Sequence, residues 1–196
     1  MSASEAEGCA FKSRRAHIFS EAADAATAVA PAERGPGSAD GLRDRDYLRR
    51  AIELAAQAER AGDVPIGAVL VCGGLVVEAK NEKEARPDPT AHAEILAIRA
   101  AARELGTWRL SGSTLFVTKE PCLMCAGAIV AARIERLVFA AYDPKGGAAG
   151  SVVDAFSLPS VNHRVSVVGG ILEEEASRQL RAFFERRRGK EDRCAR

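Results

Sequence analysis

The sequence predicts an α/β fold, a three-layer α/β/α sandwich in which helices cover both faces of a mixed five-stranded sheet. From about residue 43, apolar strand-like segments alternate with amphipathic helix-like segments. A glycine pair separates the first two strand-like segments, which is typical of a β-hairpin. The 196 residues, of which 47% are hydrophobic and 28% charged, are sufficient for one domain of ordinary size.

The first 42 residues differ from the rest of the chain. Twelve of them are alanine, few are large and apolar, and the stretch PAERGPGSADG is typical of a linker. Such a segment buries too little apolar surface to offset its ordering entropy. We therefore expect residues 1–42 to be a mostly disordered N-terminal extension, residues 43–190 to form the folded domain, and residues 191–196 to be a C-terminal tail.

The first half of the domain contains one helix and the hairpin. Residues 43–63 have apolar side chains at helical spacing and acidic residues near the start, which predicts an amphipathic helix. The segment IGAVLVC (66–72) is predicted as a buried strand. Gly73-Gly74 then turn the chain back into a second strand, LVVEAK (75–80).

The second half continues the alternation. A second helix, HAEILAIRAAARELG, begins around His92 and has Gly106 as its predicted cap. The remaining predicted elements are a strand at 114–118, a helix from about 121 to 133, a strand at 136–142, a strand at 164–170 and a terminal helix at 173–188. That last helix has acids first and bases last, which matches the helix dipole.

Composition excludes several classes of protein. The net charge of +1 is not that of a strongly basic polymer, and no apolar run approaches the ~20 residues that span a bilayer. The N-terminus lacks the apolar core of a secretory signal, and its acidic residues argue against a mitochondrial transit peptide. Five scattered cysteines make a poor disulfide framework. We expect a soluble, cytoplasmic protein in which a C-x-x-C pair binds a metal or has a redox role.

The stretches TAHAE and EPCLMC predict a zinc site. The proline before the first cysteine suits a helix start, which puts Cys122 and Cys125 on one face of the first turn and favours their thiolates. Two thiolates and the imidazole of His92 suit zinc and leave one tetrahedral position for water, as in catalytic sites. Glu94 is a poor fourth ligand, because residues i and i+2 of a helix point in nearly opposite directions. It is better placed as a general base beside that water.

This combination is the chemistry of hydrolytic deamination, in which an activated water adds to an amidine carbon and ammonia leaves. Three alternatives compete with it. The C-x-x-C pair alone fits a structural half-site or a thioredoxin-type redox pair, but a redox pair leaves His92 and Glu94 unexplained. A zinc module that only holds the fold conflicts with the open coordination position and with Glu94.

The pattern H-x-E … P-C-x-x-C is the signature of the zinc-dependent cytidine and deoxycytidylate deaminase superfamily. With VPIGAVLV, DPTAHAEILAIR, LFVTKEPCLMCAGAI, DPKGGAAGS and NHRV in order, residues 44–188 resemble the bacterial-type tRNA-specific adenosine deaminases. The resemblance implies a cytidine deaminase-like fold, one Zn²⁺ per subunit and a homodimer. It also implies conversion of adenosine to inosine at the wobble position of the tRNA anticodon stem-loop.

The resemblance carries roles over to individual residues. The implied zinc ligands are His92, Cys122 and Cys125, and the implied proton shuttle is Glu94. The implied base pocket contains Asn81, Val64 and Ile66, and the implied contacts to the anticodon loop are Asp143, Lys145, Asn162 and Phe184. Asn81 and Asp143 have an alternative role as turn caps, and Phe184 has one as a core residue. Lys119 departs from the family, which usually has an apolar residue there.

The zinc ligands and the glutamate alone do not separate adenine from cytosine or guanine. A deaminase of a free nucleobase or nucleotide, such as guanine, is therefore the alternative function. Residues 181–196 hold seven arginines or lysines against three acids and include the adjacent aromatics Phe183 and Phe184. That basic C-terminal segment favours an RNA substrate.

Overall fold

A computed structural model of the chain describes residues 39–194. The prediction of a disordered N-terminal extension falls outside the described residues, except at its last four positions. Those four belong to a helix. In this part of the chain, no helix is both long and apolar enough to cross a membrane.

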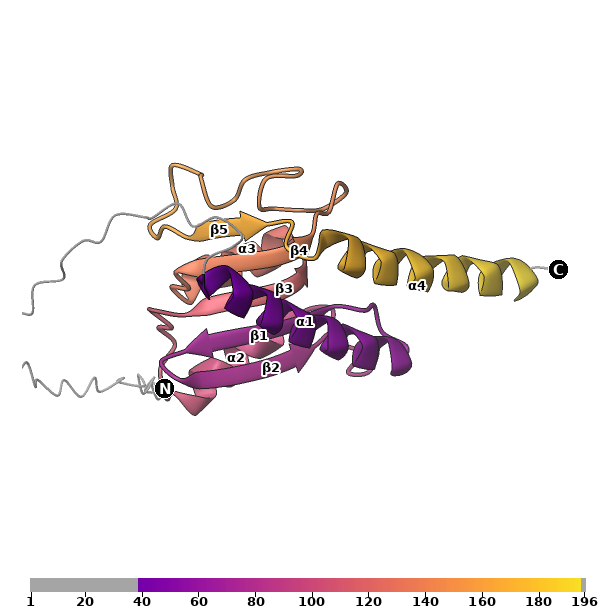
Figure 1. Ribbon diagram of the computed structural model, residues 1–196, viewed down its shortest axis with the longest axis horizontal. Helices are drawn as coiled ribbons and strands as arrows, with labels where there is room; N and C mark the ends of the chain where they lie inside the picture. The colour runs from indigo at the N-terminus through magenta and orange to yellow at the C-terminus, as the bar shows by residue number, and fades with distance from the viewer. Residues whose placement is uncertain (1–38, 195–196) are drawn as a thin grey trace, which may run out of the picture. The chain divides into compact units, whose positions relative to one another are not determined.

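The described elements follow the predicted order. They are α1 (Ala39–Arg60), β1 (Gly67–Cys72), β2 (Leu75–Lys80), α2 (Ala93–Glu104), β3 (Thr114–Lys119), α3 (Leu123–Ala131), β4 (Arg136–Ala141), β5 (Ser166–Gly169) and α4 (Glu173–Cys194). The sheet has the order β2-β1-β3-β4-β5. Strand β1 is antiparallel to β2 and β3, whereas β3, β4 and β5 are parallel. The predicted mixed five-stranded sheet is confirmed (Figure 1).

Alternation along the strands divides the core into two apolar layers. In β3, Leu115 and Val117 pack with residues of α2 and α3, whereas Phe116 between them packs with residues of α1. Figure 1 shows α1 on the near face of the sheet and α2 and α3 on the far face. The three-layer architecture therefore follows from strand residues that are buried on both faces.

Several element ends differ from the predicted ones. Helix α1 begins at Ala39 rather than at residue 43. Helix α4 continues to Cys194, past the predicted end at residue 188. Three of its six extra residues, Lys190, Glu191 and Arg193, are good helix formers, whereas the glycine costs about 1 kcal/mol. Strand β5 is only four residues long and is followed by Gly170, whose φ of +87° turns the chain away.

The segments that carry the predicted site lie together at one end of the strands of the sheet. Gly67 at the start of β1 pairs with Lys80 at the end of β2, and Lys119 at the end of β3 pairs with Ala141 at the end of β4. The N–H of Gly67 also donates to Oγ1 of Thr118 at 3.2 Å. We call this end of the sheet, where β1 begins and β2, β3 and β4 finish, the site edge. It is where ligands bind in open α/β sheets, at the carboxyl ends of the parallel strands.

Candidate active site

The three predicted zinc ligands lie at the starts of two helices. His92 is the N-cap residue of α2 and Cys122 is the N-cap residue of α3, and both have extended backbone conformations. Neither side chain caps its own helix by a hydrogen bond. Both are therefore available to each other, and buried Cys125 joins them from the first turn of α3.

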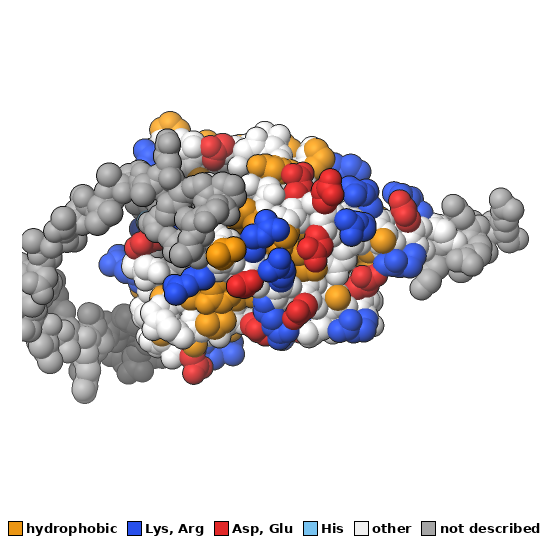
Figure 2. All heavy atoms as spheres, in the orientation of Figure 1, with side chains coloured by type: hydrophobic (Ala, Val, Ile, Leu, Met, Phe, Trp, Pro, Cys, Tyr) orange, Lys and Arg blue, Asp and Glu red, His pale blue; other side chains and the backbone are white. Residues whose placement is uncertain are grey.

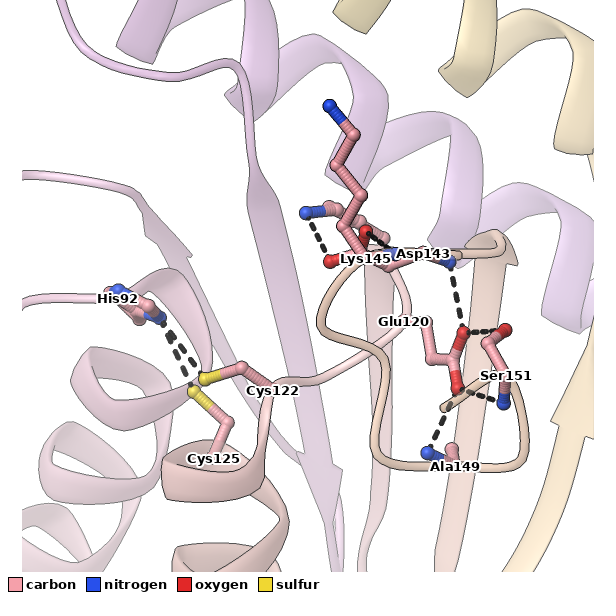
Figure 3. Close-up of polar contacts among 9 residues, drawn as sticks. His92, Glu120, Cys122, Cys125, Asp143, Lys145, Ala149 and Ser151 are labelled. Carbon is pink, nitrogen blue, oxygen red and sulfur yellow. Dashed lines mark hydrogen bonds and ion pairs between the residues drawn. The ribbon is translucent and has the colours of Figure 1, made fainter. Parts of the chain in front are cut away.

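The donor atoms of these residues converge (Figure 3). Nδ1 of His92 lies 3.7 Å from Sγ of Cys122 and 3.6 Å from Sγ of Cys125. All three donor atoms lie within 4.8 Å of one another. Tetrahedral zinc with usual Zn–N and Zn–S bond lengths places a nitrogen and a sulfur donor roughly 3.6 Å apart. The spacing and the chemistry of the donors therefore fit zinc, with room for a fourth, non-protein ligand.

The electrostatics of the pair of thiols also suit a metal. Hydrogen bonds with Cys125 and His92 lower the pKa of the Cys122 thiol to about 3. The same bond to Cys122, together with burial, raises the pKa of Cys125. The hydrogen bond to Cys122 outweighs burial and raises the pKa of His92. Both thiols bind a metal as thiolates, so metal binding at this site releases protons.

Glu94 lies beside this cluster in the first turn of α2. It is 3% exposed, and burial raises the pKa of its carboxyl group. The Glu94 carboxyl group also hydrogen-bonds the thiol of Cys125. Oε2 of Glu94 is buried and has no hydrogen-bond partner within residues 39–194. Since buried polar atoms are nearly always satisfied, this oxygen can accept a hydrogen bond from a group outside the described residues.

A second buried polar atom without a partner belongs to Asn81, at the end of β2. Its Nδ2 donates to Oδ1 of Asp63 at 2.5 Å, and its Oδ1 is buried with no partner among the described residues. Asp63 is fully buried and also accepts the backbone N–H groups of Val64 at 3.0 Å and Glu84 at 2.8 Å. A carboxylate only accepts, so the amide nitrogen of Asn81 must face Asp63 and its oxygen must point away.

Backbone hydrogen bonds connect Asn81 with the other predicted base-pocket residues. The N–H of Asn81 donates to the carbonyl oxygen of Ile66 at 2.8 Å, and Ile66 and Val64 are both half-buried. The N–H of Glu82 donates to the carbonyl oxygen of Ala91 at 3.0 Å, which brings this segment next to His92. The structure thus places the predicted apolar lining, the asparagine and the metal cluster along the site edge.

Glu120, two residues before Cys122, fastens the glycine-rich loop to the same edge (Figure 3). Its buried carboxylate accepts the N–H groups of Asp143 at 2.9 Å, Ala149 at 2.9 Å and Ser151 at 3.1 Å, and also the Ser151 hydroxyl. Burial alone would raise the pKa of Glu120, but these hydrogen bonds outweigh it and lower the pKa. Gly147 permits the approach, because a Cβ there would lie 2.3 Å from the Glu120 carboxyl group.

Sequence reasoning missed both Asp63 and Glu120. Asp63 carried one signal in the sequence, since it is an acid at the end of the predicted helix 43–63, just before the predicted strand 66–72. Glu120 directly precedes Pro121, the first residue of the P-C-x-x-C motif, and this position was its only signal in the sequence. Both residues act by accepting hydrogen bonds rather than by touching the metal donors.

The four residues predicted to contact RNA lie farther apart in the structure than the zinc ligands do. Asp143 is half-buried and forms an ion pair with Lys119, and Lys145 is exposed nearby in the same loop. Asn162 is exposed, and its Oδ1 accepts Nη1 of Arg133 at 2.5 Å. Phe184 is 43% exposed. Among the described residues, neither Asn162 nor Phe184 contacts the metal donors, so their roles stay predictions.

Comparisons with known proteins agree with this architecture. The MafB19-like deaminase family matches residues 42–188. A tRNA-specific adenosine deaminase of Bacillus subtilis (strain 168) is 49% identical over 149 residues, which cover 76% of this chain and 92% of that protein. The tRNA-specific adenosine deaminase of Haemophilus influenzae is 48% identical over 147 residues, covering 74% of this chain and 85% of that protein.

A solved structure gives the same result in three dimensions. It comes from structural studies of A-to-I editing by tRNA:A34 deaminases at the wobble position of transfer RNA. Its TM-score to this chain is 0.67 at 46% sequence identity, and the match covers 69% of this chain and 99% of the other. The chain therefore belongs to the family of tRNA-specific adenosine deaminases, within the MafB19-like deaminases.

Proposed function

We propose that this enzyme converts adenosine to inosine at the wobble position of a tRNA anticodon by hydrolytic deamination. One observation carries the proposal: the buried, unpartnered Oε2 of Glu94 lies in a carboxyl group that contacts one of three zinc-type donors. The relatives described above are named for the same activity. Free guanine is the weaker alternative substrate, because those relatives are tRNA-specific.

We infer that His92, Cys122 and Cys125 hold one Zn²⁺ per subunit. Three donors of this type leave a position for a non-protein ligand, which is typical of catalytic rather than structural zinc. When bound, zinc supplies Lewis-acid chemistry that makes water nucleophilic at neutral pH.

Glu94 then handles the protons. Its carboxylate takes one proton from the attacking water and gives it to N1 of adenine, and then carries the proton of the new C6 hydroxyl to the departing amine. A C6–O bond forms, the bond from C6 to the exocyclic nitrogen breaks, and ammonia leaves. No oxidation or reduction takes place, so the chemistry needs no redox partner. The burial that raises the pKa of Glu94 suits this role, because a group that alternately takes and gives protons works best near the ambient pH.

Asn81, Val64 and Ile66 are proposed to bind the base. The unpartnered Oδ1 of Asn81 is an acceptor for an N–H donor of the purine, and Asp63 fixes that orientation. The half-buried aliphatic side chains of Val64 and Ile66 suit the faces of a flat ring. Because a base stacked in a helix cannot enter such a pocket, the nucleotide has to be extruded from a loop.

RNA contacts are proposed for Asp143, Lys145, Asn162 and Phe184, around the site edge and on α4. The face formed by α1 is a poorer candidate. Figure 2 shows basic and acidic side chains interspersed there, and ion pairs join Arg49 with Asp46 and Arg50 with Glu78. Arg186 of α4 is also paired, with Glu59. Charges that are already compensated attract phosphates weakly.

A homodimer in the cytoplasm, where tRNA substrates are present, completes the proposal. Helix α3, LMCAGAIVA, contains no charged residue, and helices that are apolar on all sides are normally buried. Yet Leu123 is 61% exposed and Met124 is 37% exposed, next to the zinc ligand Cys122. A second copy that covers this helix start would bury both side chains.

The test is an inosine assay on a transcribed tRNA with adenosine at the first anticodon position. Parallel reactions contain free adenosine, free guanine or a tRNA with guanosine at that position. Inosine at the wobble position alone supports the proposal. Deamination of free guanine without reaction on tRNA would replace it with the alternative.

A further inference from the structure

Lys119 and Asp143 form an ion pair across two neighbouring parallel strands. Lys119 is the last residue of β3, and its register partner is Ala141, the last residue of β4. Asp143 lies two residues after Ala141. Nζ of Lys119 lies 2.6 Å from Oδ2 of Asp143. The side chains are only 29% and 14% exposed, so solvent and salt screen this pair less than a pair on the open surface.

The pair belongs to the rim of the proposed active site. Lys119 directly precedes Glu120, and the N–H of Asp143 donates to the carboxylate of Glu120. The remaining contacts of the Asp143 carboxylate come from backbone N–H groups, of Lys145 at 3.1 Å and of Gly146. Within the described residues, Lys119 is thus the ion-pair partner of the Asp143 carboxylate. Figure 3 shows the ammonium of Lys145 directed away from that carboxylate.

The charge of Asp143 matters because the proposed substrate is a polyanion. An isolated carboxylate at the rim would repel phosphates and would offset the attraction of Lys145. The carboxylate of Glu120 is already surrounded by three N–H groups and a hydroxyl. The Asp143 carboxylate depends on Lys119 for a full compensating charge.

We propose that Lys119 is a positioning residue for RNA binding: it neutralises the Asp143 carboxylate and holds it in the loop, which lets an RNA backbone approach the rim beside Lys145. This inference rests on the proposed tRNA activity. It assigns Lys119 to substrate affinity, through Asp143, and not to the chemical step.

The experiment is a double-mutant cycle in the full chain, loaded with zinc, with Lys119→Met, Asp143→Asn and the double variant. Methionine keeps the length of the side chain and removes its charge. The Michaelis constant for an anticodon hairpin is measured at low and moderate salt. We expect Lys119→Met to raise it about five- to ten-fold at low salt, with kcat changed less than about two-fold. In the Asp143→Asn background, the same substitution should change it by less than about two-fold.

Three controls distinguish this from a general defect. Lys119→Arg should retain the wild-type Michaelis constant because it retains the charge. Zinc content and melting temperature identify a variant that folds poorly, and Lys119→Gln then replaces Lys119→Met in the cycle. An unchanged Michaelis constant in Lys119→Met, or an equal rise with Asn at 143, would overturn the inference. If the wild-type enzyme leaves the hairpin unmodified, the proposed function fails instead.

Discussion

Asp63 and Asn81 are joined by a hydrogen bond of 2.5 Å between a fully buried carboxylate and a buried amide. The two residues come from different segments, one before β1 and the other after β2. Their contact removes the ambiguity that a side-chain amide normally has, because only its nitrogen can face a carboxylate. The proposed base pocket would therefore present an acceptor, the Asn81 oxygen, whose direction is set by Asp63.

Asp63→Asn should weaken substrate binding and stability together. The new amide can donate as well as accept, so it neither holds the Asn81 amide in one orientation nor satisfies all the N–H groups that Asp63 accepts. We expect kcat/KM on the hairpin to fall roughly ten-fold or more and the protein to lose about 1–3 kcal/mol of stability, with zinc retained. Asp46→Asn is the matched control, since Asp46 is an exposed acid on α1. A wild-type kcat/KM in the Asp63→Asn variant would show that Asp63 does not orient Asn81 for substrate binding.

Zinc content should depend on the two cysteines. We expect about one zinc per chain in the purified protein and almost none in a Cys122→Ser, Cys125→Ser double variant, because serine hydroxyls are poor zinc ligands. Elemental analysis measures this directly. Cys72→Ser serves as the control, since Cys72 lies outside the donor cluster. Full zinc in the double variant would contradict the assigned ligands.

Glu94→Gln should separate catalysis from metal binding. The glutamine keeps the shape but cannot accept a proton, so we expect zinc to be retained and kcat to fall by ~10²–10⁴-fold. Single-turnover assays on the hairpin, together with metal analysis, test this. Turnover close to that of the wild type would exclude Glu94 as the proton carrier.

The same variant should change the stability of the metal-free protein in a pH-dependent way. Burial raises the folded-state pKa of Glu94, so the folded protein holds this proton more tightly than the unfolded chain. The charged carboxylate therefore destabilises the fold, and this penalty is full above the raised pKa, shrinks as the pH falls below it, and disappears below the pKa of Glu94 in the unfolded chain. Metal-free Glu94→Gln should melt higher than the metal-free wild type at neutral pH, and the gap should close in acid. A gap that widens in acid would contradict this.

Sequence reasoning predicted those parts of the molecule that depend on local patterns. The alternation of segments gave the layers, and the proline and cysteine spacing gave a helix start at Cys122. Asp63 and Glu120 escaped because their partners are set by tertiary contacts, 18 to 31 positions away. The pairing of Lys119 with Asp143 likewise depends on the register of two parallel strands, which the composition of neither strand specifies.

The two adjacent phenylalanines of α4 offer a test of RNA contact with an internal control. Phe183 is buried, at 8% exposure, whereas Phe184 beside it is 43% exposed, and their rings meet edge to face with centroids 5.3 Å apart. Phe184→Ala should raise the Michaelis constant for the hairpin by roughly five-fold or more, because stacking of a base on an aromatic ring contributes about 1–3 kcal/mol. Its melting temperature should change little.

Phe183→Ala should do the opposite. Removing a buried phenylalanine costs about 3–5 kcal/mol, so its melting temperature should fall, while the Michaelis constant of the remaining folded enzyme stays near the wild-type value. Truncation after Leu180 removes both rings and mixes the two effects, which makes the paired point variants the sharper experiment. If Phe184→Ala lowers the melting temperature and leaves hairpin binding unchanged, Phe184 is a packing residue and the RNA contact on α4 is wrong.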